Sequence, residues 1–416
     1  MKLKKISIIT CCILLLIGFY SCQKDRSSEK QSNYDVQLVP ENIAKSIAEH
    51  FSMKMLHENE APTTREDDST FIPDRAIAST HVVNDKYKNP ALYIFNFYEQ
   101  GGYVIISADL NHEPICAFAD EGTVDMKDNL PGGFLIWLSK TVENIEIIRD
   151  KKYDNSKNAQ PAWIDLANQP GLTLLKAEIS KYLPLEAPPA PDDPCPGSYY
   201  SKVGPFLTTT WGQGCQYNAL CPDKNCTQCG NKRPQTGCVA TAMAQIIRYW
   251  APTNNNFGYN YGSMPSRCTD ATVNTEVQRL MRDAGQSVNM HYGCDASSAS
   301  DDDVPAALRW TFGFQPMQFG TYYNDSYLTV KNNLQHHWPV LLQGCTTSDC
   351  HEWVCDGYLA NGNNCYGYLF FHMNWGWDGM GMAFNGGGWF AFDNWNSYIG
   401  NSAYNYARTY THEIRL

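Results

Sequence analysis

The alternation of apolar and polar residues divides the chain into segments with two different periods. Apolar side chains recur at helical spacing over residues 41–51, and a second helix is predicted over residues 133–148. Residues 91–97 and 103–108 have the composition of strands and flank a Gly101-Gly102 turn. This pattern predicts a small α+β unit in the N-terminal half, which we bound at residues 39–183.

A hairpin is predicted near the C-terminal end. Residues 351–359 predict one strand, residues 361–364 a turn, and residues 366–375 a second strand rich in aromatic side chains. If the turn is centred between Gly362 and Asn363, His351 lies directly opposite Asn374. Opposed residues share one face of a sheet with Cβ atoms about 4.5–5.5 Å apart, so the Asn374 amide is expected to hold the His351 imidazole. A bulge near Gly357 would shift this register.

A helix is predicted to begin at or beside Cys238. Gly237 precedes the cysteine, and small or apolar residues follow at helical spacing over residues 239–250. Unpaired N–H groups and the positive end of the helix macrodipole stabilise a thiolate at such a position. From this segment alone, an inert or disulfide-bonded cysteine fits equally well. With His351 and Asn374, however, Cys238 completes the nucleophile, base and orienting amide of cysteine-dependent acyl transfer.

Four blocks of sequence follow one another in the C-terminal half. They are WGQG at residues 211–214, TGCVATAMAQ at 236–245, WVCDGY at 353–358 and HMNWGW at 372–377. Together they resemble the blocks of the streptopain-like cysteine peptidases over most of residues 200–416. The resemblance implies that Cys238 is the nucleophile, that His351 is the general base and acid, and that the Gln213 amide donates to the oxyanion hole. It also implies that Asn374 orients His351 and that Trp375 shields this contact from water.

The resemblance extends to fold and organisation. It implies a papain-like α+β catalytic domain at residues 200–416, with one helical layer and one antiparallel sheet. It also implies a streptopain-type prodomain at residues 39–183, which assists folding and blocks the cleft until it is removed. From the residues alone, a small binding module that stays attached is the alternative for residues 39–183.

The chain departs from the family pattern beside the expected base. Family members usually carry glycine before this histidine and alanine after it, whereas here Cys350 and Glu352 flank it. Because side chains alternate along a strand, Glu352 is expected to point to the opposite face from His351. Cys350 is expected to border and narrow the substrate cleft. A competing base, His372, lies among large aromatic residues, where a hydrogen-bonded core histidine is the expected state.

A loop at residues 297–300 is the other expected border of the cleft. The resemblance implies that Ser297 and Ser298 contact substrate there. A solvated cap for the helix predicted over residues 304–311 is the simpler alternative, because Asp301, Asp302 and Asp303 suit a helix start.

The N-terminus predicts export. Lys2, Lys4 and Lys5 precede an apolar run at residues 8–17, which is too short to span a bilayer and has the length of a signal-peptide core. Residues 18–22 resemble a lipoprotein cleavage site, with Cys22 as the lipidated residue, and residues 23–38 follow as a polar tether. More than one acyl chain gives stable anchoring, so the expected location is the bacterial envelope or cell surface. A plain secretory signal over residues 1–22 is the alternative.

Composition agrees with an exported enzyme. The chain has 416 residues, and its net charge of −11 argues against nucleic acid as a partner. Its 16 cysteines are unusual for a reducing compartment and predict disulfides. Cys226-x-x-Cys229, near Cys215 and Cys221, has the spacing of zinc ligands. No second pair or nearby histidine completes such a site, so we expect a disulfide-bonded loop, no metal and no cofactor.

A proline-rich segment at residues 184–199 separates the two predicted domains. Its prolines exclude regular structure and leave extended, exposed chain, which is what a peptidase cuts. We therefore expect cleavage between residues 184 and 205, which would release the catalytic domain from its anchor. The expected partners are protein or peptide substrates, the chain's own prodomain as intramolecular inhibitor, and a membrane through Cys22.

The predicted activity is that of an exported cysteine endopeptidase made as a self-inhibited zymogen. Two alternatives remain. A transamidase would pass the same thioester to an amine. A catalytically dead, lipid-anchored protein would bind a glycan or protein through the tryptophan-rich loop at residues 376–388.

Overall fold

The computed structural model of the chain describes residues 37–51, 76–128, 130–151, 154–168, 172–181, 199–252, 257–323, 326–345, 349–362, 367–378, 387–391 and 409–416. These residues belong to one compact unit, Val36–Leu416. The predicted signal peptide and Cys22 lie outside the described residues, as do most of the tether and the proline-rich segment up to residue 198. None of the described helices is long and apolar enough to cross a bilayer.

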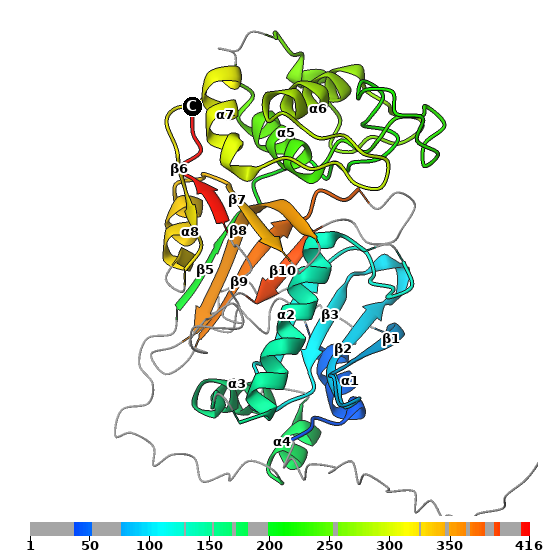
Figure 1. The fold of residues 1–416 in the computed structure, drawn as a ribbon. Helices are drawn as coiled ribbons and strands as arrows, with labels where there is room; N and C mark the ends of the chain where they lie inside the picture. The colour runs from blue at the N-terminus through cyan, green and yellow to red at the C-terminus, as the bar shows by residue number, and fades with distance from the viewer. Residues whose placement is uncertain are drawn as a thin grey trace, which may run out of the picture. The chain divides into compact units, whose positions relative to one another are not determined.

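The described strands form a single antiparallel sheet of eleven strands, with the order β1-β2-β3-β4-β10-β9-β8-β7-β11-β6 and with β5 paired to β8 (Figure 1). The four strands of the N-terminal half are β1 (Ile77–Asn84), β2 (Pro90–Phe97), β3 (Tyr103–Ser107) and β4 (Ile115–Ala119). The others are β5 (Tyr199–Val203), β6 (Gln318–Thr321), β7 (Val340–Cys345), β8 (Cys350–Gly362), β9 (Gly367–Asn374), β10 (Gly387–Ala391) and β11 (Thr409–His412).

Helices cover this sheet. The N-terminal half supplies α1 (Glu41–His50), α2 (Gly132–Arg149), α3 (Ser156–Asn168) and α4 (Thr173–Ile179), and the C-terminal half supplies α5 (Cys238–Trp250), α6 (Thr275–Ser287), α7 (Val304–Phe312) and α8 (Ser326–Gln335). Three short 3-10 helices are η2 (Tyr98–Gln100), η3 (Tyr261–Ser263) and η4 (Asp301–Asp303). The helices predicted over residues 41–51, 133–148 and 304–311, and the helix start at Cys238, are confirmed.

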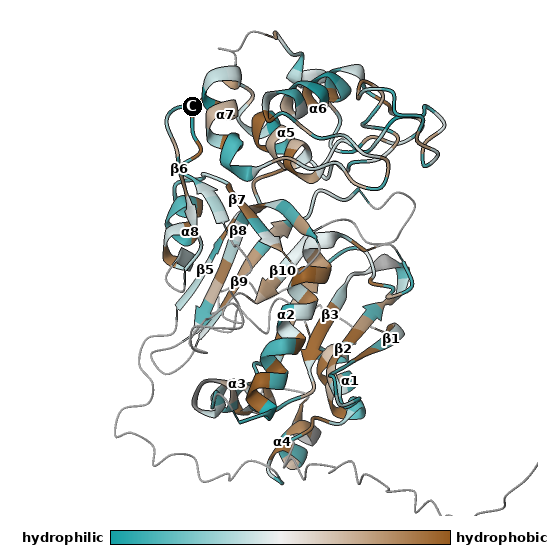
Figure 2. Cartoon of the chain, in the orientation of Figure 1, coloured by the Kyte–Doolittle hydropathy of each residue, from teal (hydrophilic) through white to brown (hydrophobic). Residues whose placement is uncertain are grey.

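Three apolar clusters account for the layering. Figure 2 shows hydrophobic residues along β2, β3 and β10 and on α2. One cluster packs α2 on one face of the sheet, with Trp137 of α2 near Trp353 of β8 and Trp375. A second packs α1, α3 and α4 on the N-terminal strands. A third joins α5, α6 and α7 to Val354 of β8, so α2 and α5 pack against alternate residues of the same strand.

The two halves share the sheet directly. Strand β4 pairs with β10 through Phe118 opposite Trp389 and Ala117 opposite Phe390. The N-terminal strands therefore extend the edge of the C-terminal sheet, and α2 lies over the join (Figure 1). This placement brings the N-terminal half up to the strand that carries His351.

The hairpin forms, but its predicted register is wrong. The last pair before the turn is Gly362 with Gly367, and a bulge between Cys355 and Gly357 shifts the ladder again. Asn374 consequently lies opposite Val354 and not opposite His351. Three positions separate His351 from Val354, so the side chains of His351 and Asn374 point to opposite faces of the sheet.

Strand β5 narrows the predicted cleavage segment. Its residues 199–203 pair with β8, so they are not the extended, exposed chain expected there. Of the residues predicted to contain the cleavage site, only 184–198 precede β5.

Candidate active site

Cys238 is the first residue of α5 and has a free thiol. Gly237 precedes it with φ 90°, a conformation that favours glycine. A Cβ at Gly237 would also lie 2.8 Å from the Met290 side chain and 3.2 Å from the Ser297 carbonyl oxygen. The residue before the cysteine is therefore fixed both by its backbone angle and by a close neighbouring loop.

The helix start does not make this thiol acidic in the form described. Burial raises the pKa of the Cys238 thiol, and backbone hydrogen bonds from Glu352, Val239 and Cys238 itself lower it less. The sequence correctly predicts the favourable backbone groups. It does not reveal the desolvation, which depends on packing and here outweighs them.

The strand residue that hydrogen-bonds to Cys238 is Glu352. Its backbone hydrogen-bonds to the Cys238 sulfur, and its side chain is 2% exposed. The Oε2 atom of Glu352 has no hydrogen-bond partner among the described residues. Burial raises the pKa of this carboxyl well above its usual value, with the nearby Cys238 and Asp301 adding to the shift. A carboxyl group whose neutral form is favoured by burial thus lies beside the thiol.

His351 points to the opposite face, as alternation requires. Its Nε2 lies 2.8 Å from the Trp375 carbonyl oxygen, and its ring stacks on Trp353 at a centroid distance of 6.3 Å. The start of α2 covers it, because a Cβ at Gly132 would lie 3.4 Å from His351 Nδ1 and one at Gly133 would lie 2.8 Å from His351 Cδ2. The expected pairing of His351 with Cys238 is therefore absent from the described structure. Alternation along β8 turns the His351 ring away from Cys238, to the face that the start of α2 covers.

Burial also changes the charge state of His351. The side chain is 6% exposed, and desolvation lowers its pKa from 6.5 to about 4, although the hydrogen bond to Trp375 partly opposes this. The ring is therefore neutral at pH 7. With the Cys238 pKa raised and the His351 pKa lowered, neither residue carries the charge of a thiolate–imidazolium pair.

Asn374 does not orient His351 in this structure, which corrects that expectation. Its Nδ2 donates to the Thr209 carbonyl oxygen at 2.7 Å, and its Oδ1 accepts from Gly376 N at 3.2 Å. It also exchanges hydrogen bonds of 3.1 Å with the Gln245 amide. Trp375 likewise shields no His351–Asn374 contact; its fully buried ring packs between Trp353 and Phe390.

Gln213 lies close to the start of α5, as the resemblance implies. Its carbonyl oxygen accepts a hydrogen bond of 3.0 Å from Thr236 N, two residues before Cys238, and the residue is buried. Two residues earlier, Trp211 N donates to Gln245 Oε1 of α5 at 3.1 Å. The segment carrying Gln213 is thus anchored to the helix that carries Cys238.

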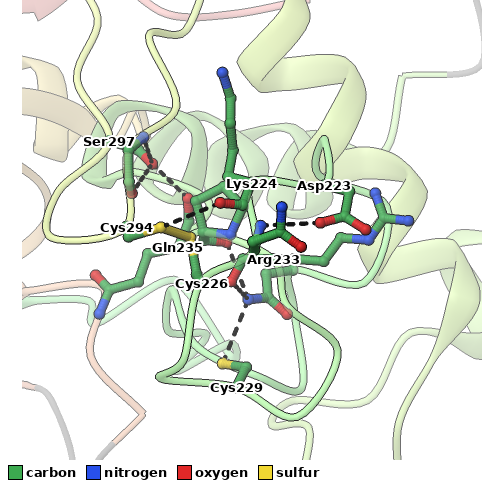
Figure 3. Close-up of a disulfide and its surroundings, with 12 residues drawn as sticks. Asp223, Lys224, Cys226, Cys229, Arg233, Gln235, Cys294 and Ser297 are labelled. Atoms are coloured by element: carbon green, nitrogen blue, oxygen red, sulfur yellow. Dashed lines mark hydrogen bonds between the residues drawn. A yellow bond between two sulfur atoms is a disulfide. The ribbon is translucent and has the colours of Figure 1, made fainter.

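Ser297 anchors the backbone that leads into Cys238 (Figure 3). Its hydroxyl donates to the Gln235 carbonyl oxygen at 2.7 Å, and the Cys226–Cys294 disulfide ties the same two loops together. Ser298 is exposed and pairs through its backbone with His291. Ser297 therefore holds the loop that leads into Cys238, while Asp301, Asp302 and Asp303 form the short helix that directly precedes α7.

The cysteine-rich loop is disulfide-bonded, as expected. Bridges join Cys215 to Cys229 and Cys226 to Cys294, while Cys221 is free. Because Cys226 and Cys229 are each bridged elsewhere, the zinc alternative is wrong. Among the described residues no group of three or more His, Cys, Asp or Glu side chains is placed to hold a metal ion.

Cys350 and His372, the other two residues singled out in the sequence, each have a partner. Cys350 is exposed and forms a disulfide with Cys345, directly across β7 and β8. His372 is hydrogen-bonded, because its Nδ1 lies 2.6 Å from Asp356 Oδ1, and it lines a cavity of about 470 Å3 together with Asn374 and Trp389. The expected hydrogen bond of His372 is therefore confirmed, but its expected place in the core is not, because the residue is half-buried.

Sequence reasoning missed Gln245 and the Gly132-Gly133 pair. Gln245 is a fully buried amide two helical turns beyond Cys238, and it joins Thr209, Trp211 and Asn374. A polar residue at that spacing on an otherwise apolar helix was the available signal. The glycine pair carries no such signal, because its partner His351 is remote in sequence.

Comparisons with known proteins agree with this architecture. Residues 211–385 match the Peptidase C10 family, and residues 37–145 match the Spi protease inhibitor family. The chain is 28% identical over 331 residues to the thiol protease/hemagglutinin PrtT of Porphyromonas gingivalis, and the aligned region covers 69% of this chain and 33% of that protein. It is 26% identical over 335 residues to streptopain of Streptococcus pyogenes serotype M1, and the aligned region covers 70% of this chain and 73% of that protein.

A solved structure supports the fold. A fragment of prointerpain A from Prevotella intermedia superposes with a TM-score of 0.52 at 23% identity, over 80% of this chain and 98% of that fragment. The present chain spans about a third of the length of the Porphyromonas relative and most of the length of streptopain. The C-terminal half of the chain therefore contains a domain of the Peptidase C10 family of cysteine peptidases, and the N-terminal half contains a domain of the Spi protease inhibitor family.

Proposed function

We propose that this protein is an exported cysteine endopeptidase made as a latent zymogen, and that the structure describes its latent form. Cys238 is the nucleophile, and His351 becomes its base once the N-terminal half has left. The observation that carries the proposal is the position of α2, whose first residues Gly132 and Gly133 cover the His351 ring while Cys238 stays a neutral thiol.

The proposed reaction follows from these positions. After the prodomain leaves, the end of β8 that carries His351 rearranges so that the imidazole reaches Cys238, because rotation of the side chain alone cannot move it to the other face of a strand. His351 then takes the thiol proton, and the thiolate attacks a peptide carbonyl carbon. The Cys238 backbone N–H and the Gln213 amide stabilise the oxyanion. His351 then protonates the leaving amine, and water hydrolyses the thioester to regenerate Cys238.

The remaining sequence expectations belong to the same proposal. Export by the residue 1–22 signal and lipid attachment at Cys22 would hold the zymogen at the bacterial envelope or cell surface. Cleavage within residues 184–198 would release the catalytic domain, since β5 begins at Tyr199. The substrates are proteins or peptides, and the prodomain is the intramolecular inhibitor.

The test is to express residues 23–416 as wild type and as Cys238→Ala, and to follow chain length and casein hydrolysis. We expect the wild type to shorten and to hydrolyse casein, and the variant to do neither. Gln213→Ala should keep part of the activity, with kcat lowered about 10²–10³-fold, because this is the typical cost of losing one oxyanion donor. A wild type that stays full-length and inactive, with an unreactive Cys238, would favour the catalytically dead binding protein.

Product analysis separates hydrolysis from transamidation. With an added amine, a transamidase would yield amide products in place of carboxylates. We expect carboxylate products to dominate at every amine concentration tested.

A further inference from the structure

Gln245 is a fully buried amide on the same side of α5 as Cys238. It comes seven positions after Cys238, which is close to two turns of 3.6 residues, so the two side chains leave the helix in nearly the same direction, about 10 Å apart along its axis. The other buried residues of α5 beyond Thr241 are apolar. A buried amide in such surroundings requires hydrogen-bond partners.

The side chain of Gln245 bonds two segments that pack beside α5. Its Oε1 accepts from Thr209 Oγ1, from Trp211 N and from Asn374 Nδ2, each at 3.1 Å. Its Nε2 donates to Asn374 Oδ1 at 3.1 Å. Both polar atoms of the amide are therefore used, and the oxygen alone joins α5 to the chain that leads to Gln213.

Residues 209–213 depend on such contacts, because they belong to no helix or strand. At one end, Thr236 N donates to the Gln213 carbonyl oxygen at 3.0 Å. Towards the other end, the bond from Trp211 N to Gln245 fixes the backbone two residues before Gln213. The position of this irregular segment relative to α5 is thus set at both ends.

We propose that Gln245 is a positioning residue for the oxyanion donor Gln213. Donors to an oxyanion act within about 2.7–3.1 Å of it, and here the Cys238 N–H and the Gln213 amide come from separate segments. Gln245 sets their separation, because it fixes residues 209–213 to the helix that begins at Cys238. The inference rests on the proposed peptidase function. It does not depend on the position of the His351 imidazole, since α5 and residues 209–213 both lie in the C-terminal half.

The first experiment measures peptide hydrolysis by Gln245→Met, which keeps the length of the side chain and removes its amide. The 23–416 chain is processed with tagged wild-type enzyme, which is then removed. We expect kcat to fall about tenfold to a hundredfold with KM nearly unchanged, because misplacement of a catalytic group by about 1 Å can cost 10²-fold. Gln213→Ala should lower kcat about 10²–10³-fold, which is the upper limit for a residue that acts through Gln213.

A double-variant cycle tests whether Gln245 acts through Gln213. In a chain that already carries Gln213→Ala, adding Gln245→Met should change kcat less than about twofold, because the donor that it positions is gone. Alkylation of Cys238 by iodoacetamide should keep its wild-type rate and pH profile in Gln245→Met. This displacement at carbon requires the thiolate but forms no oxyanion.

Thr209→Val is the milder variant and replaces Gln245→Met if that chain does not fold. It removes one bond to Gln245 with little change in shape. It should lower kcat by less than Gln245→Met does, and it should have no effect in the Gln213→Ala chain.

The matched control is Asn333→Leu, which removes a buried amide from α8. Asn333 donates to the Thr329 carbonyl oxygen at 2.8 Å and accepts from Glu413 N at 2.7 Å. This variant should have a lower Tm and the wild-type kcat per folded molecule. If Gln245→Met behaves in the same way, its amide is only structural and the inference is overturned.

The remaining outcomes separate the inference from the proposed function. An equal loss of kcat with and without Gln213→Ala, together with a shifted alkylation profile, would mean that Gln245 acts through Asn374 on the thiolate, and would overturn the inference alone. An active wild type that does not respond to Gln213→Ala would remove the donor and the inference with it. An inactive wild type would refute the proposed function itself.

Discussion

Two helices begin against the same strand from opposite faces. Helix α5 starts at Cys238 and faces Glu352, whereas α2 starts at Gly132 and faces His351, one residue along β8. Cys238 and His351, the proposed nucleophile and base, thus lie on opposite faces of the same strand. In the proposed function, latency depends on which face of β8 the His351 side chain occupies.

Burial on both faces disfavours charge, although it shifts the pKa values in opposite directions for acids and for the base. On the α5 face, burial raises the pKa values of Cys238 and Glu352, so both stay protonated. On the α2 face, burial lowers the pKa of His351 to about 4. Each face therefore stabilises the neutral form of its residue, and an ion pair requires the imidazole to change face.

The largest expected effect is a loss of kcat, and it tests whether His351 or Glu352 is the base for Cys238. In the processed enzyme, we expect His351→Ala to lower kcat by at least about 10⁴-fold, as removal of a base in a catalytic triad does. Glu352→Gln should lower it less than about tenfold, because the buried carboxyl is already neutral and the amide has nearly the same shape. Steady-state hydrolysis of a peptide substrate measures both.

A larger loss of kcat in Glu352→Gln than in His351→Ala would contradict the proposed roles of the two faces of β8. It would mean that Glu352 acts on the thiol from the place in which the structure shows it, and that His351 keeps its position under α2 for structural reasons.

The far end of α2 gives the next effect, on stability. Arg149 is buried and donates at 2.8 Å to both Asp85 and Asp109. Arg149→Ala leaves two buried carboxylates without their cation, which typically costs about 3–5 kcal/mol. We expect this loss of unfolding free energy in urea, measured in the Cys238→Ala chain to prevent self-cleavage.

The exposed pair of Lys45 with Glu49 is the matched control. Lys45→Ala removes a cation from solvent-exposed helix surface, where an ion pair is worth about 0.3–0.5 kcal/mol. Equal losses for Arg149→Ala and Lys45→Ala would show that the buried pair does not hold α2 in place.

The sequence predicts the parts of this arrangement that depend on local pattern. The start of α5 follows from apolar periodicity beginning at Cys238, and the strands around Gly101 follow from short-range alternation. The register of β8 and β9 does not follow, because it depends on a longer turn and on the bulge at Cys355–Gly357. A shift of three positions was enough to move His351 to the face away from Asn374.

The state of the site is still less accessible from sequence. The family blocks indicate which residues act together during catalysis, but not which face His351 occupies before maturation. That depends on contacts with Gly132 and Gly133, which lie more than 200 residues earlier. The raised pKa of Cys238 likewise results from burial of the thiol, which depends on tertiary packing, with a smaller contribution from the charge of Asp301.

Acid should weaken the α2 face selectively. A histidine whose pKa is about 4 when folded and 6.5 when exposed stabilises the fold fully above pH 6.5, and this contribution is lost as the pH falls towards 4. The full shift corresponds to about 3 kcal/mol. The groups that contact the ring, Gly132, Gly133, Trp353 and Trp375, carry no charge.

Glu352 acts in the opposite direction, because its raised pKa favours the folded state at low pH. We therefore expect the effect as a difference in unfolding free energy between two chains that both carry Cys238→Ala and Glu352→Gln. The chain with His351 should lose about 3 kcal/mol between pH 7 and pH 4 relative to its His351→Gln counterpart. Parallel pH profiles for the two chains would contradict burial of a neutral ring.

The smallest effect is expected from the glycine pair and gives the most direct test of the contact between α2 and His351. In Gly133→Ala the new methyl group would lie 2.8 Å from His351 Cδ2 and closer still to the Trp375 ring, so something must shift. Overpacking of this kind costs about 1–3 kcal/mol. In Gly132→Ala the methyl group would lie 3.4 Å from His351 Nδ1, an ordinary contact, and alanine suits a helix better than glycine by up to about 1 kcal/mol.

Both residues leave with the prodomain, so neither change should alter the processed enzyme. We therefore expect Gly133→Ala to lower the Tm of the Cys238→Ala zymogen and to speed self-processing of the active chain, while Gly132→Ala leaves both nearly unchanged. If the two variants behaved alike, the close approach at Gly133 would not be what keeps His351 on its side of the sheet. Latency would then have to come from the β4–β10 pairing alone, and the contact between the start of α2 and His351 would not explain it.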